Sequence, residues 1–97
     1  MKKEIQLEVI NKVRKIRQDN DISQAILAEI LGLNSYGTIG NIESNKYTHK
    51  YTLNQLYTIS NHFKYPFEKL FLSESERKLD KEQFTKILIK KIIDYDG

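Results

Sequence analysis

The sequence predicts an all-α fold, with five helices in residues 1–72 and an additional helix near the C-terminus. Apolar residues recur at the three- and four-residue intervals of amphipathic helices. Ser, Thr and Asp stand at several positions where helix N-caps are expected, and the chain contains a single proline. With 97 residues, the chain is large enough for one domain with a modest core and too small for two.

The first two predicted helices are separated by the polar segment "DNDIS". Ser23 is a suitable N-cap for a second helix over residues 24–31, and Gly32 follows it where a left-handed residue ends a helix at little cost. The first helix runs to about Asp19 on a stripe formed by Ile5, Val9, Val13 and Ile16.

Cap residues also mark the third and fourth helices. Asn34 or Ser35 can cap a third helix that runs to about Ser44. Thr52 and Gln55 form a T-x-x-Q capping box for the fourth helix. Its expected core stripe is Leu53, Leu56, Ile59 and Phe63.

The C-terminal third of the chain contains a short helix, a linker and a longer helix in this interpretation. Pro66 suits the first position of a short fifth helix, and "LSESERK" is a polar linker. Asp80 and Gln83 repeat the capping pattern for a last helix to about Tyr95. A strand is an alternative for "KILIKKII", because isoleucine favours β-structure.

The third predicted helix is poorly suited to being a helix, because Gly37 and Gly40 each cost about 1 kcal/mol relative to alanine. On a helical wheel, Ile39 and Ile42 share one side, and both glycines lie with Asn41 on the other. We therefore expect both glycines to face outward. An uncharged, hydrogen-bonding face of this kind suits the edges of bases in a DNA groove.

Charge is distributed unevenly along the chain, whose net charge is +3. Residues 1–17 carry a net charge of +4 and residues 44–69 carry +3, whereas residues 18–43 carry −4. The remaining tail is balanced. The basic surplus therefore flanks the glycine-containing helix on both sides, which suggests a nucleic-acid partner. The alternative for the first cluster is a solvated helix face.

The segment "SQAILAEILGLNSYGTIGNIESNK" resembles the helix-turn-helix of the XRE family, the phage repressor and Cro type. Matching blocks occur in the family's order over residues 10–71: "IR", "SQ" followed by "LA", "LG", "I..IE", "TL..L..IS..F" and "PFEKLF". The resemblance implies a repressor-like domain with the third helix in the major groove of double-stranded DNA and the second crossing the backbone. Residues 1–72 would form this domain, and residues 73–97 a linker and a C-terminal dimerisation helix.

The resemblance also implies roles for individual residues. Arg17 and Glu43 match an ion pair that orients the third helix, a structural role. Gln24 matches a phosphate contact, and Asn41 is expected to bond adenine. The chain has one residue more than the family pattern between Gly32 and Ile39, which we interpret as a longer turn. The expected base contacts are Ser35, Tyr36, Gly37 and Asn41, and the expected backbone contacts are Gln24, Asn34, Ser44, Lys46, Tyr47 and Lys50.

The C-terminal helix lies outside the resemblance and carries two apolar faces. Phe84, Ile87, Leu88, Ile92 and Tyr95 share a broad face, whereas Ile89 and Ile93 project elsewhere. We expect a homodimer formed through Phe84, Leu88, Ile89, Ile92 and Ile93. In the alternative, these residues fold back on helices 1 and 5 of the same chain.

Other classes of function find little support. The chain has no Cys and two isolated histidines, His49 and His62, so we expect no metal or cofactor, and no motif suggests an enzyme. There is no apolar run for a membrane span and no signal peptide, which favours the cytoplasm. The predicted function is sequence-specific transcriptional regulation, as a repressor. The alternative is an antitoxin-like or adaptor module whose C-terminal helix binds a second protein.

Overall fold

The computed structural model describes residues 1–35 and 37–97, and the described chain is helical without strands. The predicted all-α class is thus confirmed, and "KILIKKII" belongs to a helix rather than a strand. The elements in chain order are α1 (Glu4–Asp19), α2 (Gln24–Ile30), α3 (Gly37–Glu43), α4 (Leu53–Phe63), the 3₁₀ helices η1 (Phe67–Leu70) and η2 (Glu76–Lys78), and α5 (Lys81–Asp96).

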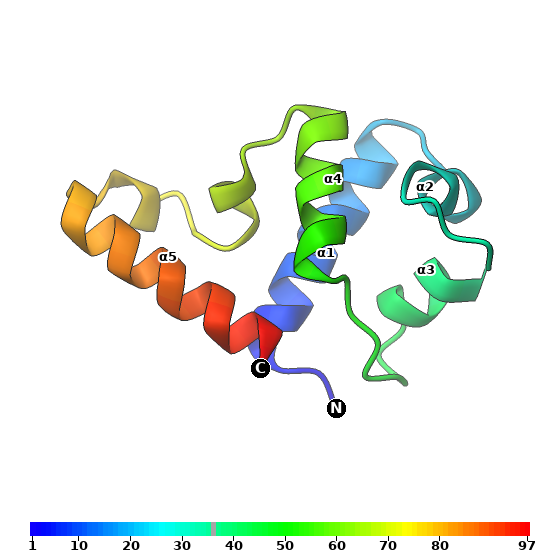
Figure 1. Ribbon diagram of the computed structural model, residues 1–97, viewed down its shortest axis with the longest axis horizontal. Coiled ribbons are helices and arrows are strands. Elements are labelled where there is room, and N and C mark those ends of the chain that lie inside the picture. The colour runs from blue at the N-terminus through cyan, green and yellow to red at the C-terminus, as the bar shows by residue number, and fades with distance from the viewer. Residues whose placement is uncertain (36) are drawn as a thin grey trace.

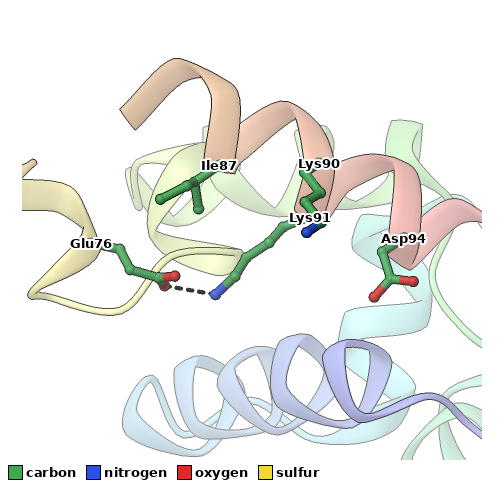
Figure 2. A pocket seen from close by; sticks show the side chains of 5 residues that line it. All are labelled: Glu76, Ile87, Lys90, Lys91 and Asp94. Atoms are coloured by element: carbon green, nitrogen blue, oxygen red, sulfur yellow. Dashed lines mark hydrogen bonds and ion pairs between the residues drawn. The ribbon is translucent and has the colours of Figure 1, made fainter. Parts of the chain in front are cut away.

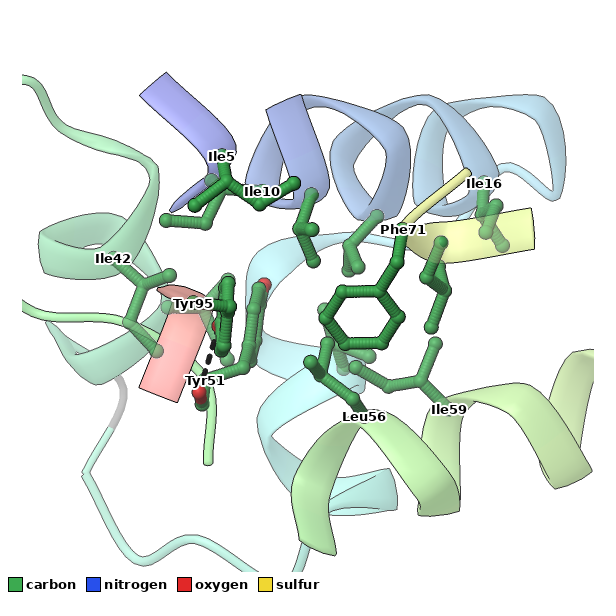
Figure 3. Packing of buried hydrophobic residues seen from close by; sticks show 14 of the residues in the cluster. Ile5, Ile10, Ile16, Ile42, Tyr51, Leu56, Ile59, Phe71 and Tyr95 are labelled. Atoms are coloured by element: carbon green, nitrogen blue, oxygen red, sulfur yellow. Dashed lines mark hydrogen bonds between the residues drawn. The ribbon is translucent and has the colours of Figure 1, made fainter. Parts of the chain in front are cut away.

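Helix α1 and helix α4 occupy the centre of the molecule, with α2 and α3 on one side and η1 and α5 on the other (Figure 1). Buried side chains from all of these elements form one core (Figure 3). The largest fully buried members are Tyr51, Tyr95, Phe71, Leu27, Ile39, Leu56, Ile59 and Leu70. The predicted stripes of the first and fourth helices supply much of this core, because their apolar residues recur with the helical period.

The local signals in the sequence place the helix ends. The Ser23 hydroxyl accepts a hydrogen bond from the Ile26 amide at 3.1 Å. Thr52 and Gln55 make both bonds of the expected capping box, at 2.9 and 3.0 Å. Gly32 has a φ of +71°, the left-handed conformation expected after α2. These bonds satisfy amides and carbonyls that a helix end leaves without partners.

Two details differ from the sequence-based expectation. Pro66 is the N-cap of a 3₁₀ turn, one position before the first helical residue that we expected it to occupy. The segment expected to be a polar linker contains the short helix η2. Ser73 supports η2, because its amide and hydroxyl exchange hydrogen bonds with Glu76 at 2.9 and 3.2 Å.

Helix α5 packs against the rest of the chain. Tyr95 is fully buried in the common core, and Leu88 and Ile92 pack against it. The core therefore extends across the predicted boundary at residue 72. Leu88 and Ile92, which were expected in the dimer interface, pack against the core of their own chain, as in the alternative in which this face folds back. Phe84 is half-buried, whereas Ile89 and Ile93 are 53% and 67% exposed.

Within residues 1–35 and 37–97, no helix combines the length and apolarity needed to cross a membrane.

Candidate nucleic-acid interface

Helix α3 is attached to the domain by one side. Ile39 and Ile42 are buried in the core, as the helical wheel predicts. Gly37 is exposed and Asn41 is half-buried. Because α3 is short and contains two glycines, its conformation depends on these buried contacts more than on intrinsic propensity.

Gly40 differs from the expectation that both glycines face outward. A Cβ atom at Gly40 would lie 3.4 Å from the Oε1 atom of Gln24, at the start of α2. Gly40 therefore faces the neighbouring helix, and a Cβ atom there would be at ordinary van der Waals distance from Gln24. A helical wheel could not show this, because it contains no information about where α2 lies.

Glu43 at the end of α3 is the centre of an ion-pair network. Arg17 of α1 contacts both carboxylate oxygens, with Nε and Nη2 each at 2.9 Å. Gln24 donates to Oε1 at 2.9 Å. Arg14 lies 3.4 Å from the same oxygen and also donates to the Glu43 carbonyl. The structure therefore contains the Arg17–Glu43 pair that the family resemblance implies, and it links α1, α2 and α3.

The environment of Glu43 determines its protonation. Burial raises the pKa of its carboxyl group, but hydrogen bonds from Arg17 and Gln24 and the charges of Arg17 and Arg14 outweigh this, so the net pKa is lowered. Glu43 is thus held as a carboxylate at neutral pH. Arg14 was not identified from the sequence, although its position three residues before Arg17 places both on one side of α1.

Gln24 has a different position from the one expected of a phosphate contact. Its side-chain nitrogen is used within the protein, in the hydrogen bond to Glu43. This bond places the amide group between α2 and α3 instead of directing it away from the molecule. The network fixes the angle between the two helices, so Gln24 supports the interface in this structure.

The remaining expected contacts lie on the segments at the two ends of α3 (Figure 1). Asn34 and Ser35 are exposed before it, and Tyr36 lies outside the described residues. After α3, Lys46 and Tyr47 are exposed and Lys50 is half-buried. These residues and the outer side of α3 are therefore adjacent along one edge of the molecule.

Ser44 and the loop that follows contain contacts that the sequence did not indicate. The Ser44 hydroxyl accepts from the Lys46 amide at 3.2 Å, and its carbonyl accepts from Lys2 Nζ. Lys2 is only 7% exposed, and its pKa is lowered by burial and by the nearby Arg14 charge. Tyr47 and His49 make an edge-to-face contact with ring centroids 5.6 Å apart. Ser44 is half-buried, and its carbonyl is engaged in a contact within the protein.

A pocket lies elsewhere on the molecule, between α5 and η2 (Figure 2). It has a volume of about 330 Å³ and is lined by Glu76, Ile87, Lys90, Lys91 and Asp94. Lys91 and Glu76 form an ion pair of 2.6 Å across it. None of the expected DNA contacts lines this pocket. In the described part of the chain, no group of three or more acidic, His or Cys side chains could hold a metal ion.

Comparisons with protein families, with curated proteins and with solved structures give no match to this chain.

Proposed function

We propose that this protein is a sequence-specific double-stranded DNA-binding transcriptional regulator, a repressor, that reads the major groove with α3. The observation that carries the proposal is the attachment of α3 by one side only. Ile39, Ile42 and the Glu43 network hold its inner side, and Gly37 and Asn41 remain on the other. Because the outer side of α3 carries no charged groups, it can approach the edges of bases without burying a charge that has no partner.

The connection between α2 and α3 supports the same function. Helix α2 ends at Ile30, Gly32 follows in the left-handed conformation, and α3 begins at Gly37, the order of elements in a helix-turn-helix. The Glu43 network fixes the two helices relative to α1. A preorganised α3 enters the groove without a further ordering cost.

The charged residues around α3 fit contacts to the DNA backbone. Lys46 and Lys50 lie on the loop after α3, where ammonium groups can neutralise phosphates on one side of the groove. Each neutralised phosphate contributes a slope of about −0.9 to the dependence of log affinity on log salt concentration. Asn41 is suited to the bidentate contact that an amide makes with adenine.

Substitutions at Asn41 and Lys46 test this division of roles. The target is first obtained by selecting bound duplexes from a random pool. Asn41→Ala is expected to lose about 1 to 3 kcal/mol of binding free energy at one base position and to relax specificity there. Lys46→Ala is expected to weaken all duplexes alike and to reduce the salt slope by about 1.

Glu29→Ala, an exposed substitution on α2 away from these contacts, is the control. Equal weakening by Asn41→Ala and Lys46→Ala on every duplex contradicts the assigned roles. An absence of DNA binding at low salt contradicts the proposed function itself.

We further propose that the regulator acts as a homodimer paired through the exposed stripe of α5, defined as Lys86, Ile89, Ile93 and Asp96. All four residues are exposed and recur at helical spacing. In an antiparallel pair, Ile89 of one copy meets Ile93 of the other, and Lys86 meets Asp96. This self-complementary order is what a two-fold interface requires. Leu88 and Ile92 pack against the core of their own chain and Phe84 is half-buried, so the proposed dimer set is smaller than the set expected from the sequence.

Sedimentation at micromolar concentration tests the dimer. Two isoleucines per copy bury far less than the roughly 1,200 Å² of a stable interface, so we expect a weak, concentration-dependent dimer that bound DNA strengthens. Ile93→Asp should leave a folded monomer at all concentrations, and Tyr57→Asp, which alters an apolar side chain that is 57% exposed on α4, should leave the dimer intact. A wild-type monomer, both free and on DNA, refutes the dimer. It would favour the antitoxin-like or adaptor alternative, in which the stripe binds a different protein.

A further inference from the structure

The loop between α3 and α4, residues 44–51, is held at both ends by residues far away in the sequence. At its start, Lys2 Nζ donates a hydrogen bond to the Ser44 carbonyl. At its end, the Tyr95 hydroxyl donates to the Tyr51 carbonyl at 2.7 Å (Figure 3). Tyr51 and Tyr95 are both fully buried, so this second bond is shielded from water.

The two anchors are also joined to each other. Gln6 Nε2 in the first turn of α1 donates to the Tyr95 carbonyl at 2.8 Å. Lys3 Nζ donates to the Asp94 carbonyl at 3.1 Å. The N-terminal segment and the last turn of α5 therefore lie side by side (Figure 1). Together, these two segments hold both ends of the α3–α4 loop.

The middle of the loop has little support of its own. Residues 45–49 are exposed, and the contacts within the described loop are the Lys46 amide bond to Ser44 and the Tyr47–His49 edge contact. A short loop with fixed ends has few accessible conformations, whereas release of one end multiplies them. The position of Lys46 and Lys50 thus depends on the anchors.

We propose that Tyr95 and Lys2 are positioning residues that hold the α3–α4 loop in its DNA-contacting place. As far as DNA is concerned, this inference rests on the proposed function. In this arrangement, the last turn of α5 affects DNA binding through the position of the loop. Any event that lifts this turn from α1 and withdraws the buried Tyr95 from the core lowers DNA affinity by the free energy that couples the two, whereas pairing through the exposed stripe leaves Tyr95 in place.

Loop order in the absence of DNA gives the first test. Tyr95→Phe removes only the hydroxyl that holds the Tyr51 carbonyl. Tyr51→Phe is the matched control, because the buried Tyr51 hydroxyl has no hydrogen-bond partner among the described residues. We expect backbone order parameters of residues 45–50 to fall from about 0.85 toward 0.6 in Tyr95→Phe, and to stay unchanged in Tyr51→Phe and throughout α3.

Lys2→Met provides a second variant, because it removes the anchor at the other end of the loop and keeps an apolar stem. We expect the same loss of order in residues 45–50. Order parameters that match those of the wild type in both variants would overturn the proposal. If Tyr95→Phe fails to fold, the order parameters of Lys2→Met alone decide whether the anchors order residues 45–50.

DNA binding gives a readout that a purely structural role would not move. We expect Tyr95→Phe to reduce affinity about fivefold and to make the salt slope shallower, by up to about 0.9 for each phosphate that the displaced loop no longer neutralises. In a Lys46→Ala, Lys50→Ala background the same change should have no effect, because Tyr95 acts through these lysines. An undiminished effect in that background refutes the coupling. If the wild type binds no DNA, the proposed function fails. The order parameters still show whether Tyr95 and Lys2 hold the loop.

Discussion

Glu43→Ala is expected to lower the free energy of unfolding by about 3 to 5 kcal/mol, because it leaves the charge of Arg17 buried without its partner. The Arg17 side chain is 12% exposed and that of Glu43 is 5% exposed, so water cannot take the place of the carboxylate. Arg14 and Gln24 are deprived of a partner in the same step. Urea unfolding at pH 7, followed by circular dichroism, measures the difference.

Glu29→Ala serves as the control, since Glu29 is an exposed glutamate on α2 and its loss should change stability by less than about 0.5 kcal/mol. Glu43→Gln keeps the shape of the side chain and removes its charge. We expect it to lie between the wild type and Glu43→Ala. A Glu43→Ala variant as stable as the control would show that the network contributes nothing to holding α3.

The same carboxylate predicts a loss of stability in acid. Its pKa in the folded protein lies below the ordinary value of 4.5, so it binds fewer protons folded than unfolded near that pH. Its contribution is therefore complete above about pH 4.5 and declines as the pH falls through the lower, folded pKa. Glu43→Gln lacks this contribution. The stability difference between wild type and Glu43→Gln should shrink as the pH falls below the ordinary carboxyl pKa of 4.5 in urea titrations.

Features that depend on neighbouring residues could be predicted from the sequence. Ser23, Gly32, Thr52 and Asp80 act on backbone groups two or three residues away, so their spacing alone identifies the helix ends. The burial of Ile39 likewise follows from the helical period. The inner side of the candidate interface was therefore foreseeable.

Features that depend on distant segments could not be predicted. Gly40 faces α2 because of how the two helices pack, and the sequence does not encode that packing in any local pattern. A lysine at the second position would ordinarily be expected in solvent, yet Lys2 is buried on a carbonyl 42 residues away. The broad apolar face of α5 is compatible with a dimer or with folding back, and only the docked position of Tyr95 distinguishes them.

Tyr95→Ala is expected to destabilise the whole domain by about 3 to 5 kcal/mol, the usual cost of removing a large aromatic side chain from a core. Tyr95 is fully buried and packs edge to face on Phe71, with ring centroids 5.7 Å apart. It also holds the Tyr51 carbonyl, which would be left buried without a donor. Global unfolding in urea, monitored at several probes, should shift as one transition.

Lys90→Ala is the matched control on the same helix, because Lys90 is exposed, lies outside the proposed dimer stripe, and its loss should cost less than about 0.5 kcal/mol. Comparing Tyr95→Ala with this control shows whether α5 is an appendage or part of the core. If α5 were an appendage, Tyr95→Ala would unfold only residues 73–97 and leave the stability of α1 to α4 unchanged. If α5 completes the core, loss of one tyrosine lowers the stability of α3 as well, because Tyr95, Ile39 and Ile42 belong to the same buried cluster. We expect the second result, since the last turn supplies one of the two largest fully buried side chains of a small domain, and its loss lowers the stability of the whole cooperative unit.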